Sequence, residues 1–125
     1  MADAVIYADA AGKIRLWNGA AVRLFGYSAA EALGQGLDLI IPEHLRARHW
    51  QAFGAAMSSG VMRLQGRPTL TRARQQSGRK LYVEMTFALV EEPGAHAHGA
   101  VAVARDVTER VEQQRAATRR DGPEL

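Results

Sequence analysis

The chain has 125 residues, of which 47% are hydrophobic and 23% are charged, and its formal net charge is +3. This composition is typical of one globular domain with an apolar core, and it excludes an intrinsically disordered chain. The absence of cysteine excludes disulfides, thiolate metal sites and cysteine nucleophiles. The basic residues are spread along the chain, so their small excess does not predict a nucleic-acid partner.

No apolar segment reaches the roughly 18 consecutive residues that a membrane-spanning helix needs. The first residues, Met1 to Ala4, lack the basic and apolar regions of a secretory signal peptide. These two features predict a soluble protein that is located in the cytoplasm and has no membrane partner.

Two short strands are predicted near the start of the chain, over residues 4–8 and 14–17. The first is a β-rich apolar run, and the second alternates apolar with polar side chains. Asp9 and Gly12 lie between them, and these residue types are typical of a tight turn in which glycine takes the left-handed conformation. A β-hairpin is therefore expected.

A group of helices is predicted after this hairpin. Asn18 is positioned to cap a helix that Gly26 ends, and Ser28 with Glu31 has the capping-box spacing of a second short helix. The longest helix is predicted over residues 42–58, because the proline at its start is favoured in a first helical turn.

The second half of the chain predicts three strands and a terminal helix. Apolar side chains alternate with polar or small ones over residues 81–89, and flanking strands are expected over residues 69–74 and 100–107. Thr108 is expected to cap a helix that runs to about residue 120. Strands grouped apart from helices indicate an α+β domain. We expect a five-stranded antiparallel sheet, covered on one face by several short helices and one longer helix, with a C-terminal exit helix.

Several short motifs resemble those of the PAS family of sensory domains. They are Asp9–Ile14, Trp17–Asn18, Leu24–Tyr27, Glu31–Gly34, Gln76–Gly78 and Asp106–Thr108. The resemblance implies a PAS domain over residues 1–107, followed by the start of a signalling helix and a tail over residues 108–125. It also implies a sensory module rather than an enzyme. Such a module relays a signal to an output domain, and no output domain is evident in these residues.

One histidine lies on the apolar face of the predicted long helix. His44 is about 140° away from His49 around the helix axis and therefore faces solvent. The residues that share the apolar face are Leu45, His49, Ala52, Phe53, Ala56 and Met57. A buried imidazole needs a hydrogen-bond partner or a metal, so His49 is a candidate metal ligand.

The segment Pro42–His49 resembles the corresponding helix of haem-binding PAS domains in oxygen-sensing histidine kinases and phosphodiesterases. In those proteins the last histidine of this pattern is the proximal iron ligand, which implies that role for His49 and b-type haem as the cofactor. The same resemblance puts Arg67 at the distal position that meets the bound gas. It also puts Met85 and Phe87 among the distal residues that project from the sheet.

Other residues complete this predicted haem pocket. Arg63 is a candidate contact for a haem propionate, and Met85 is an alternative sixth iron ligand through its thioether. Leu45, Phe53 and Met57 are expected to contact the macrocycle from the long helix, since they share the face of the proximal histidine.

Two alternatives remain open from the sequence. A similar histidine occurs in PAS domains with no reported cofactor, so a cofactor-free interaction or dimerisation module is one alternative, and a PAS domain that binds another small ligand is the second. Flavin of the light-sensing type is disfavoured because the adduct-forming cysteine is missing. The predicted partners of a haem-bound domain are a diatomic gas (O2, CO or NO), an output domain and, as a further candidate, a second copy of the chain.

Overall fold

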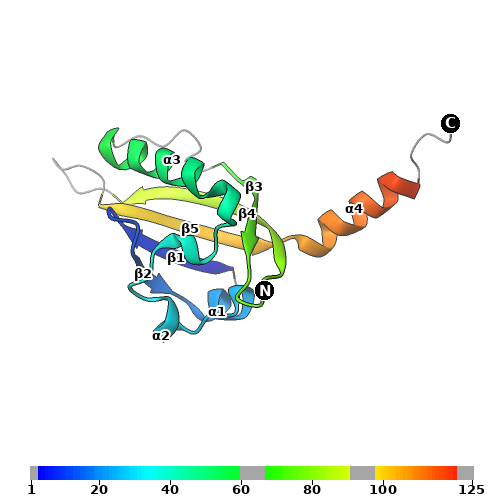
Figure 1. Cartoon of the computed structure of the whole chain (residues 1–125), viewed down its shortest axis with the longest axis horizontal. Helices are drawn as coiled ribbons and strands as arrows, with labels where there is room; N and C mark the ends of the chain where they lie inside the picture. The colour runs from blue at the N-terminus through cyan, green and yellow to red at the C-terminus, as the bar shows by residue number, and fades with distance from the viewer. Residues whose placement is uncertain (1–2, 60–66, 91–97, 121–125) are drawn as a thin grey trace.

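The five strands of the chain form one antiparallel sheet in the order β2-β1-β5-β4-β3 (Figure 1). The computed structural model describes residues 3–59, 67–90 and 98–120. The strands are β1 (Ala4–Asp9), β2 (Ile14–Trp17), β3 (Thr69–Arg74), β4 (Lys80–Val90) and β5 (Gly99–Asp106). The α-helices are α1 (Gly19–Phe25), α2 (Ala29–Ala32), α3 (Arg46–Ser59) and α4 (Thr108–Arg120), and two 3-10 turns are η1 (Leu37–Leu39) and η2 (Glu43–Leu45). The predicted α+β class, the five antiparallel strands and the exit helix are confirmed.

The hairpin of β1 and β2 forms around a turn that the sequence specifies in detail. The Asp9 carboxylate accepts hydrogen bonds from the backbone N–H groups of Ala11 at 3.0 Å and Lys13 at 2.9 Å. Gly12 has a φ of +79°, the left-handed conformation that side chains other than glycine rarely adopt. Strand β1 then pairs with β5 as well as β2, so the first strand lies inside the sheet.

The two short helices begin at the predicted caps. Asn18 Oδ1 accepts hydrogen bonds from Ala21 N at 2.9 Å and from Val5 N at 3.0 Å, so one side chain caps α1 and ties it to β1. Ser28 and Glu31 form both hydrogen bonds of the capping box of α2.

The long helix begins later than the sequence predicts. Pro42 has an extended backbone, with φ of −54° and ψ of 141°, and it precedes the 3-10 turn η2 instead of opening α3. Leu45 N donates to Pro42 O at 2.9 Å, a bond that spans three residues and gives the tighter 3-10 turn. The first α-helical residue is therefore Arg46, and the preceding turn η1 was not predicted.

The core lies between the sheet and the helices that cover one of its faces. Along β1 and the first half of β4, buried and half-buried residues alternate, as expected for strands with one covered face. The largest fully buried side chains are Phe25, Ile6, Ile14, Leu81, Val83 and Thr108. The other sheet face remains partly accessible.

The exit helix α4 leaves the sheet directly from β5 and extends away from the body (Figure 1). Thr108 is 2% exposed, and its hydroxyl accepts a hydrogen bond from Tyr82 N at 2.9 Å and lies 2.6 Å from Asp106 Oδ1. Val107 and Val111 are buried beside it. Within the described residues, no helix has the length and apolar character needed to cross a membrane.

Candidate functional site

The first turns of α3 are held in place by a tryptophan that the sequence analysis did not single out. Trp50 Nε1 donates a hydrogen bond to Asp38 Oδ1 at 2.5 Å. Its ring packs over the turn between β1 and β2, so closely that a Cβ added to Gly12 would lie 2.2 Å from a ring atom. Arg46 adds bonds to the carbonyl oxygens of Ile41 at 3.1 Å and Asp38 at 3.2 Å. The beginning of α3 is thereby fixed to η1 and to the hairpin turn.

This anchoring also determines where His49 lies, because His49 directly precedes Trp50 on the same helix. Its ring is half-buried, with its centroid 4.9 Å from that of Trp50 and 5.9 Å from that of Phe53. The Nδ1 atom is buried and has no hydrogen-bond partner within the described part of the chain. An imidazole nitrogen removed from water without a partner is costly, typically by about 1–3 kcal/mol.

Burial also sets the charge of this imidazole. Desolvation lowers the pKa of His49 below its ordinary value of 6.5, and the nearby Asp38 carboxylate opposes the shift only in part. The ring is therefore neutral at pH 7, which is the protonation state that binds a metal.

The predicted apolar residues of α3 gather beside this histidine. Phe53 and Met57 are buried, and together with Ala56 and Ala100 of β5 they form a small cluster that is separate from the main core. The partly buried side chains that pack against it are Leu37, Trp50 and Leu89. Leu45 is half-buried one turn before His49. Ala52 was expected on this face but is exposed, because the helix turns its Trp50 side toward η1 instead.

Met85 and Phe87 lie on the same face of β4 as Leu89 but belong to the neighbouring main core. Met85 is 7% exposed and packs among buried residues of that core, and Phe87 is half-buried against it. The structure therefore places Phe53 and Met57 in one cluster, with the His49 ring beside Phe53. Met85 lies in the adjoining main core, and Phe87 packs against that core.

Arg67, which was assigned to the distal side, is not among the side chains that form or pack against this cluster in the described residues. Arg67 is exposed just before β3, and its carbonyl oxygen accepts a hydrogen bond from the Thr69 hydroxyl at 3.4 Å. Arg63 lies outside the described residues. Their proposed roles rest on the family resemblance.

The donor set beside α3 suits haem better than a bare metal ion. Within the described residues, no three His, Cys, Asp or Glu side chains come together in a way that would hold an ion. Haem needs only one protein ligand, since the porphyrin supplies four nitrogens, and a neutral imidazole is a common axial ligand. His49, with an unpartnered buried nitrogen and its ring beside those of Trp50 and Phe53, meets this requirement. A macrocycle would separate apolar side chains that pack together here.

A sheet with helices over one face and a helix that continues from its last strand defines a small α+β domain of the kind that sensory proteins use. More particularly, a family model described as the PAS fold matches residues 1–107. The chain therefore belongs to the PAS family and is a PAS sensory module.

Three curated proteins resemble this chain over a small part of their own length. Sensor protein FixL of Bradyrhizobium diazoefficiens is 49% identical over 47 residues, which cover 38% of this chain and 9% of that protein. Oxygen sensor protein DosP of Escherichia coli is 26% identical over 82 residues, or 66% of this chain and 10% of that protein. An uncharacterized protein of Azorhizobium caulinodans is 31% identical over 118 residues, which cover 94% of this chain and 16% of that protein.

Solved structures share the fold. The PAS domain of a Colwellia psychrerythraea protein has a TM-score of 0.74 at 22% identity, covering 86% of this chain and 88% of that one. An RNA-binding light-oxygen-voltage receptor has a TM-score of 0.71 at 25% identity, covering 97% of this chain and 34% of that one. A Rhodobacter sphaeroides LOV protein has a TM-score of 0.69 at 13% identity, covering 93% and 65%. Because light-oxygen-voltage proteins are among these structures, the fold alone does not determine the cofactor.

Proposed function

We propose that this PAS module binds b-type haem beside α3 through His49 and senses a diatomic gas. The observation that carries the proposal is the half-buried, neutral imidazole of His49, whose buried Nδ1 has no partner in the described residues and whose ring lies against those of Trp50 and Phe53. The similarity to an oxygen sensor protein and to a sensor protein supports it. A haem bound here supplies an iron with a coordination position open to O2, CO or NO.

The protein's own residues have separate tasks in this function. His49 would hold the group from α3, and its neutral state leaves a ring nitrogen available as the donor. Phe53 and Met57, both buried, would keep water away from the side of the haem that His49 binds. Leu45, which is half-buried, would lie at the edge of that side. We assign Arg67 to the distal side, where a guanidinium is suited to a charge-assisted hydrogen bond with a bound polar ligand.

Three further residues and an output domain complete the proposed function. Met85 and Phe87 would form an apolar wall on the sheet side, and the Met85 thioether is the alternative residue that would hold the iron. Arg63 is assigned to a propionate. An output domain is the proposed recipient of the signal, since the chain spans between 9% and 16% of the three curated relatives described above.

A physical route connects the site with the exit helix. Ala100 belongs to the apolar cluster beside α3 and lies near the start of β5, and that strand ends at Asp106, directly before α4. A displacement of α3 changes the packing on Ala100. The hydrogen-bonded ladder between β5 and β4 then carries the change to Thr108. Such coupling requires that the two ligand states differ in their contacts with this strand.

The test is haem reconstitution of the purified chain, followed by absorption spectroscopy. Wild type is expected to take up one haem per chain, to show an intense Soret band and to change spectrum with CO. His49→Gly should lose this spectrum and regain it when free imidazole is added, because the small ligand fills the space of the deleted ring. His44→Gly is the matched control, since His44 is exposed one turn earlier.

Two results would contradict the proposal. A wild-type protein that stays colourless after reconstitution would instead favour the cofactor-free interaction module. A His49→Gly spectrum identical to that of His44→Gly would remove His49 as the ligand while leaving haem binding itself intact.

A further inference from the structure

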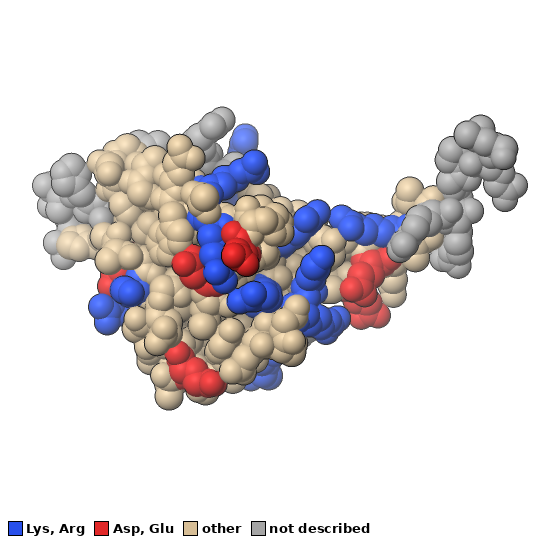
Figure 2. All heavy atoms as spheres, viewed as in Figure 1, with Lys and Arg blue, Asp and Glu red and all other residues tan. Residues whose placement is uncertain are grey.

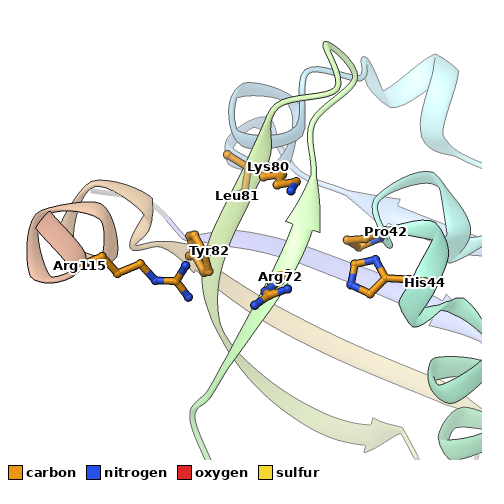
Figure 3. Close-up of a pocket in the computed structure, with 7 residues that line it drawn as sticks. All are labelled: Pro42, His44, Arg72, Lys80, Leu81, Tyr82 and Arg115. Carbon is orange, nitrogen blue, oxygen red and sulfur yellow. The ribbon is translucent and has the colours of Figure 1, made fainter. Parts of the chain in front are cut away.

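A separate cavity of about 220 Å³ lies where β3, β4, η2 and α4 approach one another (Figure 3). Its walls include Arg72 of β3, Lys80 and Tyr82 of β4, Arg115 of α4 and His44 of η2. None of the residues assigned to the haem site lines it. It draws on the hairpin of β3 and β4 and on two elements, η2 and α4, that are distant from this hairpin in the sequence.

The charge of this cavity is strongly one-sided. Arg72, Lys80 and Arg115 each carry a positive charge at neutral pH, and His44 adds two nitrogens that can take part in hydrogen bonds. No Asp or Glu lines the cavity in the described part of the chain. Figure 2 shows Lys and Arg side chains gathered on the surface from the body toward the exit helix. Several cationic side chains in the wall of one cavity favour an anionic occupant.

Tyr82 organises two of these cations. The guanidinium carbon of Arg115 lies 4.8 Å from the centre of the Tyr82 ring, and that of Arg72 lies 6.0 Å from it. In Figure 3 the Tyr82 ring lies between these two arginines. A guanidinium held over an aromatic face still presents its N–H groups at its edge, so it binds an oxyanion with less loss of side-chain freedom.

The size of the cavity limits the occupant. A volume of about 220 Å³ equals that of roughly seven water molecules in the liquid and is below the range of drug-sized pockets, which begin at about 300 Å³. We propose that the cavity binds a small, multiply charged phosphate-type anion from solution, with Arg72 and Arg115 as its principal ligands.

Binding of the anion would connect the sheet with the middle of α4. These two parts are otherwise held together mainly at the start of this helix. Arg72 belongs to the edge strand β3, whereas Arg115 lies seven residues after Thr108, where α4 begins. An anion that contacts both guanidiniums at once ties the third turn of α4 to the sheet. The anion would therefore restrict the helix that leaves the domain.

Isothermal titration with pyrophosphate at low ionic strength tests this proposal. We expect saturable binding to the wild-type chain and about tenfold weaker binding for Arg72→Gln and for Arg115→Gln, because each loses a charge-assisted hydrogen bond. Arg23→Gln is the matched control, since it removes the same charge from α1, away from the cavity. Its affinity should remain within about twofold of wild type.

Hydrogen exchange gives a second, independent readout. At a pyrophosphate concentration near the wild-type dissociation constant, exchange of the amides around Arg115 should slow in the wild type and in Arg23→Gln, and clearly less in Arg72→Gln. The proposal is overturned if pyrophosphate does not bind, or if all three variants weaken binding equally, which would indicate net charge alone. It is also overturned if a single-stranded RNA binds while pyrophosphate neither binds nor competes.

Discussion

Replacing Gly12 by alanine should reveal how strongly the hairpin turn positions α3. Gly12 has a φ of +79°, so alanine there incurs left-handed strain of about 1–2 kcal/mol. In addition, the new Cβ would lie 2.2 and 2.3 Å from two ring atoms of Trp50, where ordinary contact begins at 3.4 Å. The indole must therefore move by about 1 Å, and overpacking of this kind costs typically about 1–3 kcal/mol. The expected loss of unfolding free energy is about 2–5 kcal/mol.

Gly34→Ala is the matched control. Gly34 has a φ of +85°, and nothing lies within 4 Å of the position that its Cβ would occupy. It therefore carries the backbone strain without the collision, and we expect a loss of about 1–2 kcal/mol. The difference between the two variants measures the contact with Trp50.

Urea unfolding followed by circular dichroism measures both losses, and a double-mutant cycle identifies their cause. In a Trp50→Ala background, Gly12→Ala should cost no more than Gly34→Ala, because the ring that it collides with is gone. Equal losses for the two glycines in the wild-type background would refute the reasoning. So would an excess at Gly12 that persists without the indole.

The remaining predictions concern the exit helix and the hairpin turn. Thr108→Val should lower the unfolding free energy by about 1–3 kcal/mol, because it leaves the half-buried N–H of Tyr82 without the acceptor that the buried Thr108 hydroxyl provides. Thr118→Val, on the exposed part of the same helix, should change it by less than about 0.5 kcal/mol in the same urea titration, and similar losses would contradict this role. The hydrogen bond from Arg15 lowers the pKa of the Asp9 carboxyl, so stability from this group is present above its ordinary pKa and is lost as the pH falls through the lowered value. In Arg15→Ala, an NMR titration should find the pKa of Asp9 raised, and an unchanged value would exclude that bond as the cause.

The sequence was sufficient to predict the fold because its signals are local. The turn glycine Gly12, the cap Asn18 and the capping box of Ser28 each act within a few residues, and the structure contains all three. The error at Pro42 has a local cause as well. Proline is compatible with a first helical turn and also with an extended residue before a 3-10 turn, and its presence does not distinguish them.

The surroundings of the candidate site were predictable only in part, because they depend on contacts between distant segments. Helical spacing placed His49 beside Phe53, and their rings are neighbours in the structure. The contact of Trp50 with Gly12 joins α3 to a turn near the start of the chain, and no periodicity encodes it. The same holds for the basic cavity, which needs β3, β4, η2 and α4 to converge before its charges are neighbours.

The buried apolar side chains at the start of α4, and of the residue just before it, limit how this helix can transmit a signal. Val107 and Val111 are 6% and 7% exposed, since they pack against the body of the domain. The described residues that follow Val111 on α4 are largely polar or charged and mostly exposed, so α4 has no free apolar seam for a coiled coil. A change in the domain must therefore act by altering how α4 is held, through Thr108 at its start and Arg115 over Tyr82. Self-association through this segment of α4 alone would require the two valines to leave the core, at a cost of about 1.5–3 kcal/mol for each side chain exposed.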